Sequence, residues 1–220
     1  MRGIPEIISY ESVVTPPFSE HALLRNDFPG FQEDYLVLHA LIRRYRPSRF
    51  LEIGTSTGRG TNVICHATGL RKRRNIWGAV WPPLHSKVYS IDVPVGTDPS
   101  IIYPEGEDGH QKKPGTECAY RYVQLYGDST EFDFRPYYPL DGWFVDGKHN
   151  FEYVRRDTLQ ALKSEPRIIV WHDMQIEEVK EAVLAVIKEK GQAYHLYQVE
   201  KTRMAFAARR DCQRKDRLGL

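Results

Sequence analysis

The 220-residue sequence has few cysteines, no long apolar run and little net charge. Its three cysteines, Cys65, Cys118 and Cys212, are odd in number and widely spaced, which indicates neither a disulfide framework nor a zinc cluster. No apolar run approaches the roughly 20 residues that a membrane helix needs, and the first residues contain no signal-peptide core. We therefore expect a cytoplasmic protein that does not associate with membranes.

The formal net charge of +2 is too small to predict a nucleic-acid partner. Basic residues cluster at Arg71–Arg74 and at Arg209–Arg217, but such runs are usually solvated surface. The apolar fraction of 41% and the charged fraction of 27% are typical of a globular domain, and the length suits one domain.

Short apolar runs alternate with helical patterns over most of the chain. Strands are expected at Arg49–Ile53, Lys87–Ile91, Tyr122–Tyr126, Gly142–Val145, Arg167–Trp171, Tyr194–Val199 and Arg203–Ala208. Helices are expected at Glu33–Arg46, from the glycine-rich segment after Ile53 to Leu70, at Phe151–Lys163 and at Ile176–Lys190. This alternation predicts an α/β fold with a doubly wound, mostly parallel seven-stranded sheet and an antiparallel C-terminal hairpin.

Composition divides the chain into three regions. Residues 1–30, rich in proline and polar residues, are predicted to be an irregular N-terminal arm, residues 31–208 the folded domain, and residues 209–220 a basic tail. Two segments of the domain, 71–86 and 93–121, are long for α/β connections and are predicted to be insertions. The second follows the carboxyl end of a strand, where a lid over a ligand site is expected.

The segment Phe50–Thr61 is the strongest functional signal. An apolar strand runs into Gly54-Thr55-Ser56-Thr57-Gly58, and a helix pattern follows. Glycine permits a sharp turn and the close approach of a ligand, and the helix N-terminus offers free N–H groups. Glu52, at the end of the strand, is a candidate partner for a cationic or hydroxyl-bearing group. This corner predicts a site for a nucleotide-like cofactor.

Two other interpretations of the same corner stay open. Gly54-Thr55-Ser56-Thr57-Gly58 also fits the G-x-S-x-G elbow of α/β-hydrolases, which would make Ser56 a nucleophile. An elbow needs several strands before it, whereas one helix pattern precedes Phe50. The corner is also compatible with an ordinary strand–turn–helix connection that binds nothing.

Polar residues also end the next four strands. They are Asp92, Gly127-Asp128-Ser129, Asp146-Gly147-Lys148-His149 and His172-Asp173. Aspartate and glycine are ordinary turn residues, and Asn150 has the character of a helix N-cap, so one such strand end alone would not indicate a site. Five consecutive strands with polar residues at the same end predict a lined pocket.

In this order the motifs resemble those of class I S-adenosylmethionine-dependent methyltransferases. More narrowly, they are similar to the branch whose fourth strand ends in V-D-G-x-H-x-Y and whose fifth ends in H-D. The resemblance spans roughly Glu33 to Ala208 and is carried by Glu52–Gly58, Ile91-Asp92, Gly127–Ser129, Phe144–Tyr153 and Val170–Asp173. It implies a Rossmann-like methyltransferase fold, S-adenosylmethionine as cofactor, and O-methylation of a small-molecule acceptor.

The resemblance also implies roles for individual residues. The cofactor-binding set is Glu52, Gly54, Thr55, Ser56 and Gly58 around the methionine part, Asp92 at the ribose, and Gly127, Asp128 and Ser129 at the adenine. Asp146, His172 and Asp173 fall where some relatives bind a divalent cation, which implies Mg²⁺ or Mn²⁺; a histidine ligand favours the latter.

His149 is the candidate general base, because its unperturbed pKa lies near neutrality, and Lys148 is the alternative.

Two other function classes stay open. A nicotinamide-dependent oxidoreductase would need a tighter glycine motif than this corner has. A non-catalytic cofactor-binding or assembly module would use Trp77 and Trp81 as an interface. The sequence identifies neither the methyl acceptor nor whether the chain forms a homo-oligomer.

Overall fold

The computed structural model describes residues 4–14, 32–56, 58–69, 73–74, 80–81, 87–94 and 122–213. Most of the two predicted insertions, 71–86 and 93–121, lies outside these residues, so the expected lid stays a prediction. Within the first insertion, the short strands β3 (Arg73–Arg74) and β4 (Val80–Trp81) pair in antiparallel fashion.

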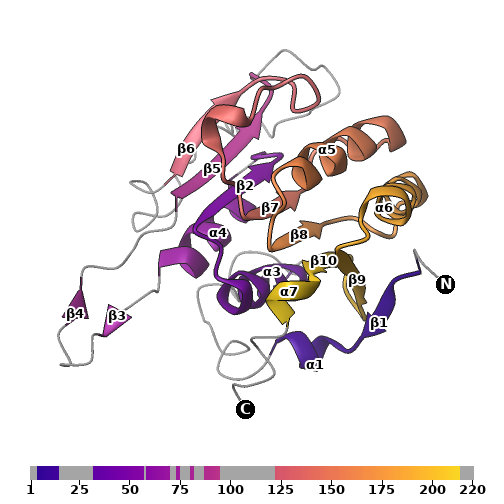
Figure 1. The fold of residues 1–220 in the computed structure, drawn as a ribbon, viewed down its shortest axis with the longest axis horizontal. Coiled ribbons are helices and arrows are strands. Elements are labelled where there is room, and N and C mark those ends of the chain that lie inside the picture. Colours follow the sequence, from indigo (N-terminus) through magenta and orange to yellow (C-terminus); the bar gives the residue numbers. More distant parts are fainter. Residues whose placement is uncertain are drawn as a thin grey trace.

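An eight-stranded sheet forms the centre of the fold (Figure 1). Its spatial order is β1 (Glu6–Ile8), β9 (Tyr194–Val199), β10 (Ala205–Arg209), β8 (Ile168–Trp171), β7 (Gly142–Val145), β2 (Arg49–Ile53), β5 (Lys87–Asp92) and β6 (Tyr122–Tyr126). Every neighbouring pair from β8 to β6 is parallel, whereas β10 runs antiparallel to both β8 and β9. The predicted doubly wound sheet with an antiparallel C-terminal hairpin is confirmed.

The eighth strand comes from the segment for which composition predicted an irregular arm. Residues 6–13 are regular instead, because β1 is followed by the short helix α1 (Tyr10–Val13). β1 pairs in parallel with β9, from Glu6 opposite Tyr197 to Ile8 opposite Val199. Beyond it, Val13 and Val14 are buried in the core. The basic tail is likewise regular at its start, where Arg209 ends β10 and α7 (Arg210–Gln213) follows.

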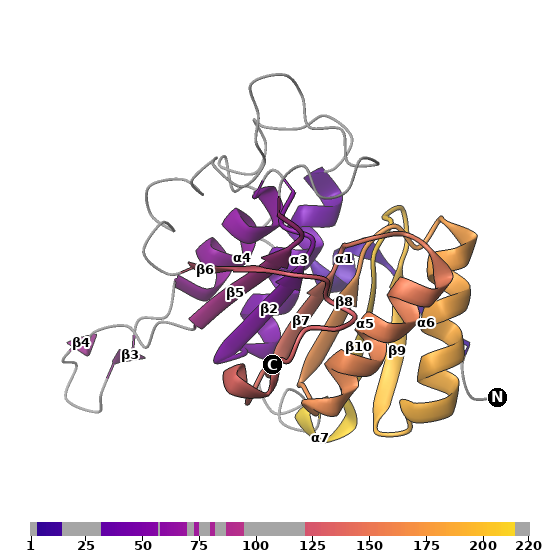
Figure 2. The same ribbon diagram turned by 90° about the horizontal axis from the view of Figure 1, so that it is seen from above.

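Helices cover both faces of the sheet (Figure 2). α3 (Gln32–Tyr45) and α4 (Arg59–Gly69) pack on one face, and α5 (Phe151–Lys163) and α6 (Glu177–Lys190) on the other; the 3₁₀ helix η2 (Arg135–Tyr137) precedes β7. Since successive strand side chains point to opposite faces, Phe50 packs with α3 and α4 while Leu51 packs with α5 and α6. Among the helices described, none has the length and hydropathy needed to cross a lipid bilayer.

The strand order reverses between β2 and β7, which lie side by side in the middle of the sheet. In open parallel sheets, ligands bind outside the carboxyl ends of the strands at such a reversal. Gly54 lets the two strand ends converge: it has φ +93°, and a Cβ atom there would lie 2.0 Å from the carbonyl oxygen of Asp146. The close approach predicted at this glycine is therefore made by the chain that follows β7.

Candidate functional site

The glycine-rich corner and the end of β5 meet through Asp92. The backbone N–H of Ser56 donates to Asp92 Oδ2 at 2.8 Å, and that of Val93 donates to Oδ1 at 2.8 Å. The corner turns at Ser56, with φ 45°, and at Gly58, with φ 78°. Thr57 lies outside the described residues. The fold thus brings the glycine-rich corner at Ser56 into contact with Asp92.

A buried polar network lies beneath this corner. Glu52, only 1% exposed, accepts hydrogen bonds from the hydroxyls of Thr61 and Ser90, the second at 2.7 Å. The Ser90 hydroxyl also lies 2.6 Å from that of Thr55. Burial raises the pKa of Glu52 to about 8. A Cβ atom at Gly60 would lie 2.3 Å from Glu52 Oε1, so α4 passes directly over this carboxyl. Glu52 and Thr55 therefore support the corner from inside the fold.

The loop after β6 joins the same edge of the sheet. The N–H of Gly127 donates to the carbonyl of Asp92 at 3.0 Å, which ties the ends of β6 and β5 together. Asp128 Oδ1 accepts hydrogen bonds from the N–H and the hydroxyl of Thr130. Burial favours a higher pKa for Asp128, but these hydrogen bonds hold that pKa below its usual value. Asp128 is consequently a fixed, ionised acceptor beside the corner.

Helix α5 supports this loop through two side chains one helical turn apart. Tyr153 donates its hydroxyl proton to Asp128 Oδ2 at 3.2 Å. Asp157 is 1% exposed, and burial raises its pKa to about 7, an effect that the Ser129 side chain partly offsets. Tyr153 belongs to the motif segment quoted above but was given no role there, and Asp157 was not predicted, although their i, i+4 spacing places both on one face of the predicted helix.

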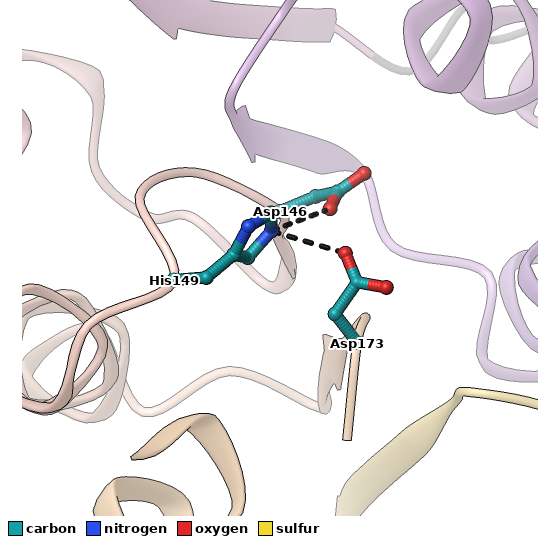
Figure 3. A group of neighbouring side chains, drawn as sticks. All are labelled: Asp146, His149 and Asp173. Atoms are coloured by element: carbon teal, nitrogen blue, oxygen red, sulfur yellow. Dashed lines mark ion pairs between the residues drawn. The ribbon is translucent and has the colours of Figure 1, made fainter. Parts of the chain in front are cut away.

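A cluster of carboxylates and imidazoles lies at the ends of β7 and β8. Figure 3 shows the His149 ring directed at Asp146 and Asp173. His149 Nε2 lies 3.0 Å from Asp173 Oδ2 and 3.7 Å from Asp146 Oδ1, and one donor atom from each of the three residues falls within 4.8 Å of the others. Hydrogen bonds to Asp146 and Asp173 raise the pKa of His149 to about 9. The ring is therefore mostly protonated at neutral pH when no further charge is bound.

His172 approaches the same two carboxylates from inside the fold. Its Nδ1 lies 3.0 Å from Asp173 Oδ2 and 3.3 Å from Asp146 Oδ1, yet makes no well-directed hydrogen bond within the described part of the chain. Burial opposes its charge, but the carboxylates of Asp146, Asp173 and Asp34 raise the pKa of His172 to about 11. All three predicted metal ligands thus meet at one point, with His149 beside them.

Lys148, the alternative base, contacts the ring of Tyr153. It is exposed, and its Nζ sits 4.9 Å from the ring centroid of Tyr153, at cation–π distance. Of the two candidate bases, the fold brings His149 to the carboxylates.

Two charged residues that the sequence analysis missed complete the cluster. Asp34 comes from the first turn of α3, and Arg203 from the turn between β9 and β10. Arg203 donates to Asp34 Oδ2 from Nε at 2.9 Å and from Nη2 at 2.7 Å, and to Asp173 Oδ1 from Nη1 at 3.2 Å. These residues are far apart in the sequence, and an acidic residue in a first helical turn is common, so no local pattern marks this pair.

Comparison with known proteins places this fold. No family model and no curated protein matches the sequence. Among solved structures, the O-methyltransferase TomG from Streptomyces achromogenes, in complex with SAM and involved in tomaymycin synthesis, is 17% identical with a TM-score of 0.55, over 91% of this chain and 93% of that one. An O-methyltransferase from Bacillus cereus in complex with SAH is 15% identical with a TM-score of 0.55, over 91% and 90%.

A third similar structure contains a metal ion. The MycE methyltransferase of the mycinamycin biosynthetic pathway, in complex with Mg, SAH and mycinamycin VI, is 15% identical with a TM-score of 0.51, over 83% of this chain and 50% of that one. At these identities the similarity establishes the fold alone. The chain has the Rossmann-like fold of these methyltransferases.

Proposed function

We propose that this chain is an S-adenosylmethionine-dependent methyltransferase that methylates a hydroxyl oxygen of a small molecule with the help of a divalent metal ion. The observation that carries this proposal is the convergence of polar strand ends on the reversal of the sheet. Asp92 and Asp128 lie on one side of it, and the Asp146–His149–Asp173 cluster lies on the other. The fold shared with methyltransferases crystallised with SAM or SAH supports this choice of methyl donor.

The proposed cofactor site follows the strand ends from β2 to β6. Each oxygen of Asp92 accepts one backbone N–H and, having two lone pairs, retains capacity to accept a ribose hydroxyl. The loop of Asp128 and Ser129 would face the adenine, and the corner from Gly54 to Gly58 the methionine part. The carboxylates at these strand ends suit the positive charge of the sulfonium.

The residues at the ends of β7 and β8 fit a divalent cation. The Nδ1 of His172 points at the same place as the oxygens of Asp146 and Asp173, and these three residues would hold the ion. A mixed nitrogen and oxygen donor set suits Mn²⁺ or a similar transition metal better than Mg²⁺. When bound, such an ion would orient the acceptor hydroxyl and lower its pKa.

In the proposed reaction the acceptor oxygen attacks the methyl carbon in line with the carbon–sulfur bond. That bond breaks, its electron pair stays on sulfur, and S-adenosylhomocysteine leaves. His149 Nε2 takes the hydroxyl proton, which requires the neutral imidazole. Hydrogen bonds to Asp146 and Asp173 orient the ring and raise the pKa of His149 to about 9, and a cation held by these carboxylates would favour the neutral imidazole.

Calorimetric titration of the metal-stripped protein tests the cofactor first. We expect micromolar binding of S-adenosylmethionine and S-adenosylhomocysteine and no binding of NAD, with a change in affinity when Mn²⁺ is added. Binding of NAD alone, or of none of the three, would remove the basis of the methyltransferase proposal.

His149→Gln then tests the chemistry, with Lys148→Gln as the matched control from the same loop. S-adenosylhomocysteine release is measured against a panel of phenolic and sugar hydroxyl compounds. Loss of a general base lowers kcat by roughly 10²–10⁴-fold, and we expect this for His149→Gln with the affinity for S-adenosylhomocysteine nearly unchanged. Lys148→Gln should stay within a few-fold of wild type; the reverse ranking would make Lys148 the base.

A further inference from the structure

Asp34 is a buried carboxylate that links α3 to the candidate metal cluster. It is 3% exposed, its Oδ1 accepts the backbone N–H of Arg203 at 2.9 Å, and its Oδ2 accepts the guanidinium of the same residue. Asp34 Oδ2 also lies 3.3 Å from Nε2 of His172. Arg203 holds this carboxylate in place and reaches on to Asp173.

This contact determines which nitrogen of His172 faces the site. An imidazole that binds a metal ion through Nδ1 keeps its remaining proton on Nε2, and a carboxylate next to Nε2 can accept that proton in a hydrogen bond. Nδ1 lies 3.0 Å from Asp173 Oδ2 and 3.3 Å from Asp146 Oδ1, so this nitrogen is the one that faces the candidate metal site. The Phe144 ring lies at 80° to the imidazole, with the ring centroids 6.2 Å apart.

Arg203 also lies close to the same nitrogen, with Nη2 3.1 Å from His172 Nε2. A guanidinium can only donate, so a proton on Nε2 requires that Nη2 direct its own N–H groups elsewhere. The 2.7 Å distance from Nη2 to Asp34 Oδ2 provides that acceptor. Asp34 thus accepts from Arg203 and is placed to accept from Nε2 of a metal-bound His172, and removing its charge disturbs both contacts.

We propose that Asp34 is a positioning residue that holds His172 Nδ1 in the candidate metal site and thereby makes the site prefer Mn²⁺ to Mg²⁺. The inference rests on the proposed metal-assisted function and extends it to a residue outside the ligand set. Outer carboxylates that hydrogen-bond a metal-ligating histidine fix its orientation, and losing them typically costs 10–100-fold in metal affinity. Mg²⁺, which prefers oxygen ligands, depends less on the nitrogen.

A double-mutant cycle measures this effect as a ratio of affinities. The dissociation constants of Mn²⁺ and Mg²⁺ are determined for the wild type, Asp34→Asn, His172→Asp and the double variant, with S-adenosylhomocysteine present. We expect Asp34→Asn to weaken Mn²⁺ binding roughly 10–100-fold and Mg²⁺ binding much less. His172→Asp replaces the nitrogen by an oxygen and should lower the preference for Mn²⁺ by itself, after which Asp34→Asn should lower it no further.

Asp141→Asn is the matched control. This carboxylate is also held by backbone N–H groups and an arginine, but it lies at the opposite end of β7. The Asp141→Asn variant should leave the ratio of the Mn²⁺ and Mg²⁺ affinities unchanged. Equal weakening of both ions by Asp34→Asn, or the same fall in preference with and without His172, would overturn the proposal.

The wild-type protein supplies a second measurement in case Asp34→Asn does not fold. Nitrogen NMR of histidine-labelled protein loaded with Zn²⁺ should show His172 bound to the metal through Nδ1 and protonated at Nε2. Coordination through Nε2, or a His172 signal that does not change when Zn²⁺ is added, would overturn the inference. If the wild type binds S-adenosylhomocysteine but no metal, this inference and metal assistance fail and the cofactor proposal stands. If it binds Mn²⁺ in preference to Mg²⁺ but no S-adenosylhomocysteine, the methyltransferase proposal fails alone.

Discussion

At the residue scale, the ionisation of Asp157 has a measurable cost for the folded state. Burial raises its pKa to about 7, far above that of an exposed aspartate, so the unfolded chain releases this proton before the folded protein does. As pH rises from about 4 to 7, the folded state therefore becomes less stable through this one group, and the loss is complete above pH 7.

Asp157→Asn removes this titration while keeping the shape of the side chain. Relative to wild type, the variant should gain about 2 kcal/mol more in unfolding free energy at pH 8 than at pH 5. Urea denaturation at the two pH values measures the difference. An Asp157→Asn effect independent of pH would mean that the carboxyl titrates normally.

At the element scale, the N-terminal segment completes the sheet and part of the core. Val14 is 4% exposed in the core, whereas Ile7 on β1 is 66% exposed. Val14→Ala should lower the unfolding free energy by roughly 1–3 kcal/mol, because it leaves a cavity that the surroundings fill only in part. Ile7→Ala should change it by less than about 0.5 kcal/mol. Urea unfolding checks both, and a silent Val14→Ala would show that this segment does not pack on the domain in solution.

The elements also differ in how far local pattern predicts them. Helix α5 has the predicted bounds because its signals are local: Asn150 caps it by accepting the N–H of Tyr153, and its apolar positions recur at helical spacing. β1 has three residues and no periodicity of its own, so pairing with β9 forms the strand. A composition rich in proline and polar residues says nothing of a partner nearly two hundred positions away.

At the scale of the whole molecule, the proposed cofactor site joins strand ends from both sides of the sheet reversal. A ligand that binds only the folded state stabilises it by about 2.7 kcal/mol at a hundred times its dissociation constant. We expect S-adenosylhomocysteine at that excess to shift a single urea transition as a unit, and NAD at the same concentration to leave it in place. A biphasic curve in which only one phase responds would contradict a site shared by the two halves.

Much of this protein was determined by the sequence alone. Continuous apolar strands between amphipathic helices predict a parallel sheet covered on both faces, and the residues after each strand are then expected to share one edge. That reasoning is enough to assign the Asp146–His149 segment and His172-Asp173 to neighbouring positions at this edge. It works because strand periodicity and helix capping are local properties.

Only the tertiary structure decided what each of these side chains faces. It placed Glu52 under α4 rather than in an open pocket, and it directed His149, not Lys148, at the carboxylates. It also brought Asp34 and Arg203 to His172. These contacts join residues far apart in the sequence, and their geometry depends on how helices pack on the sheet. Burial and the distance between charges, which set each pKa, exist only after that packing is complete.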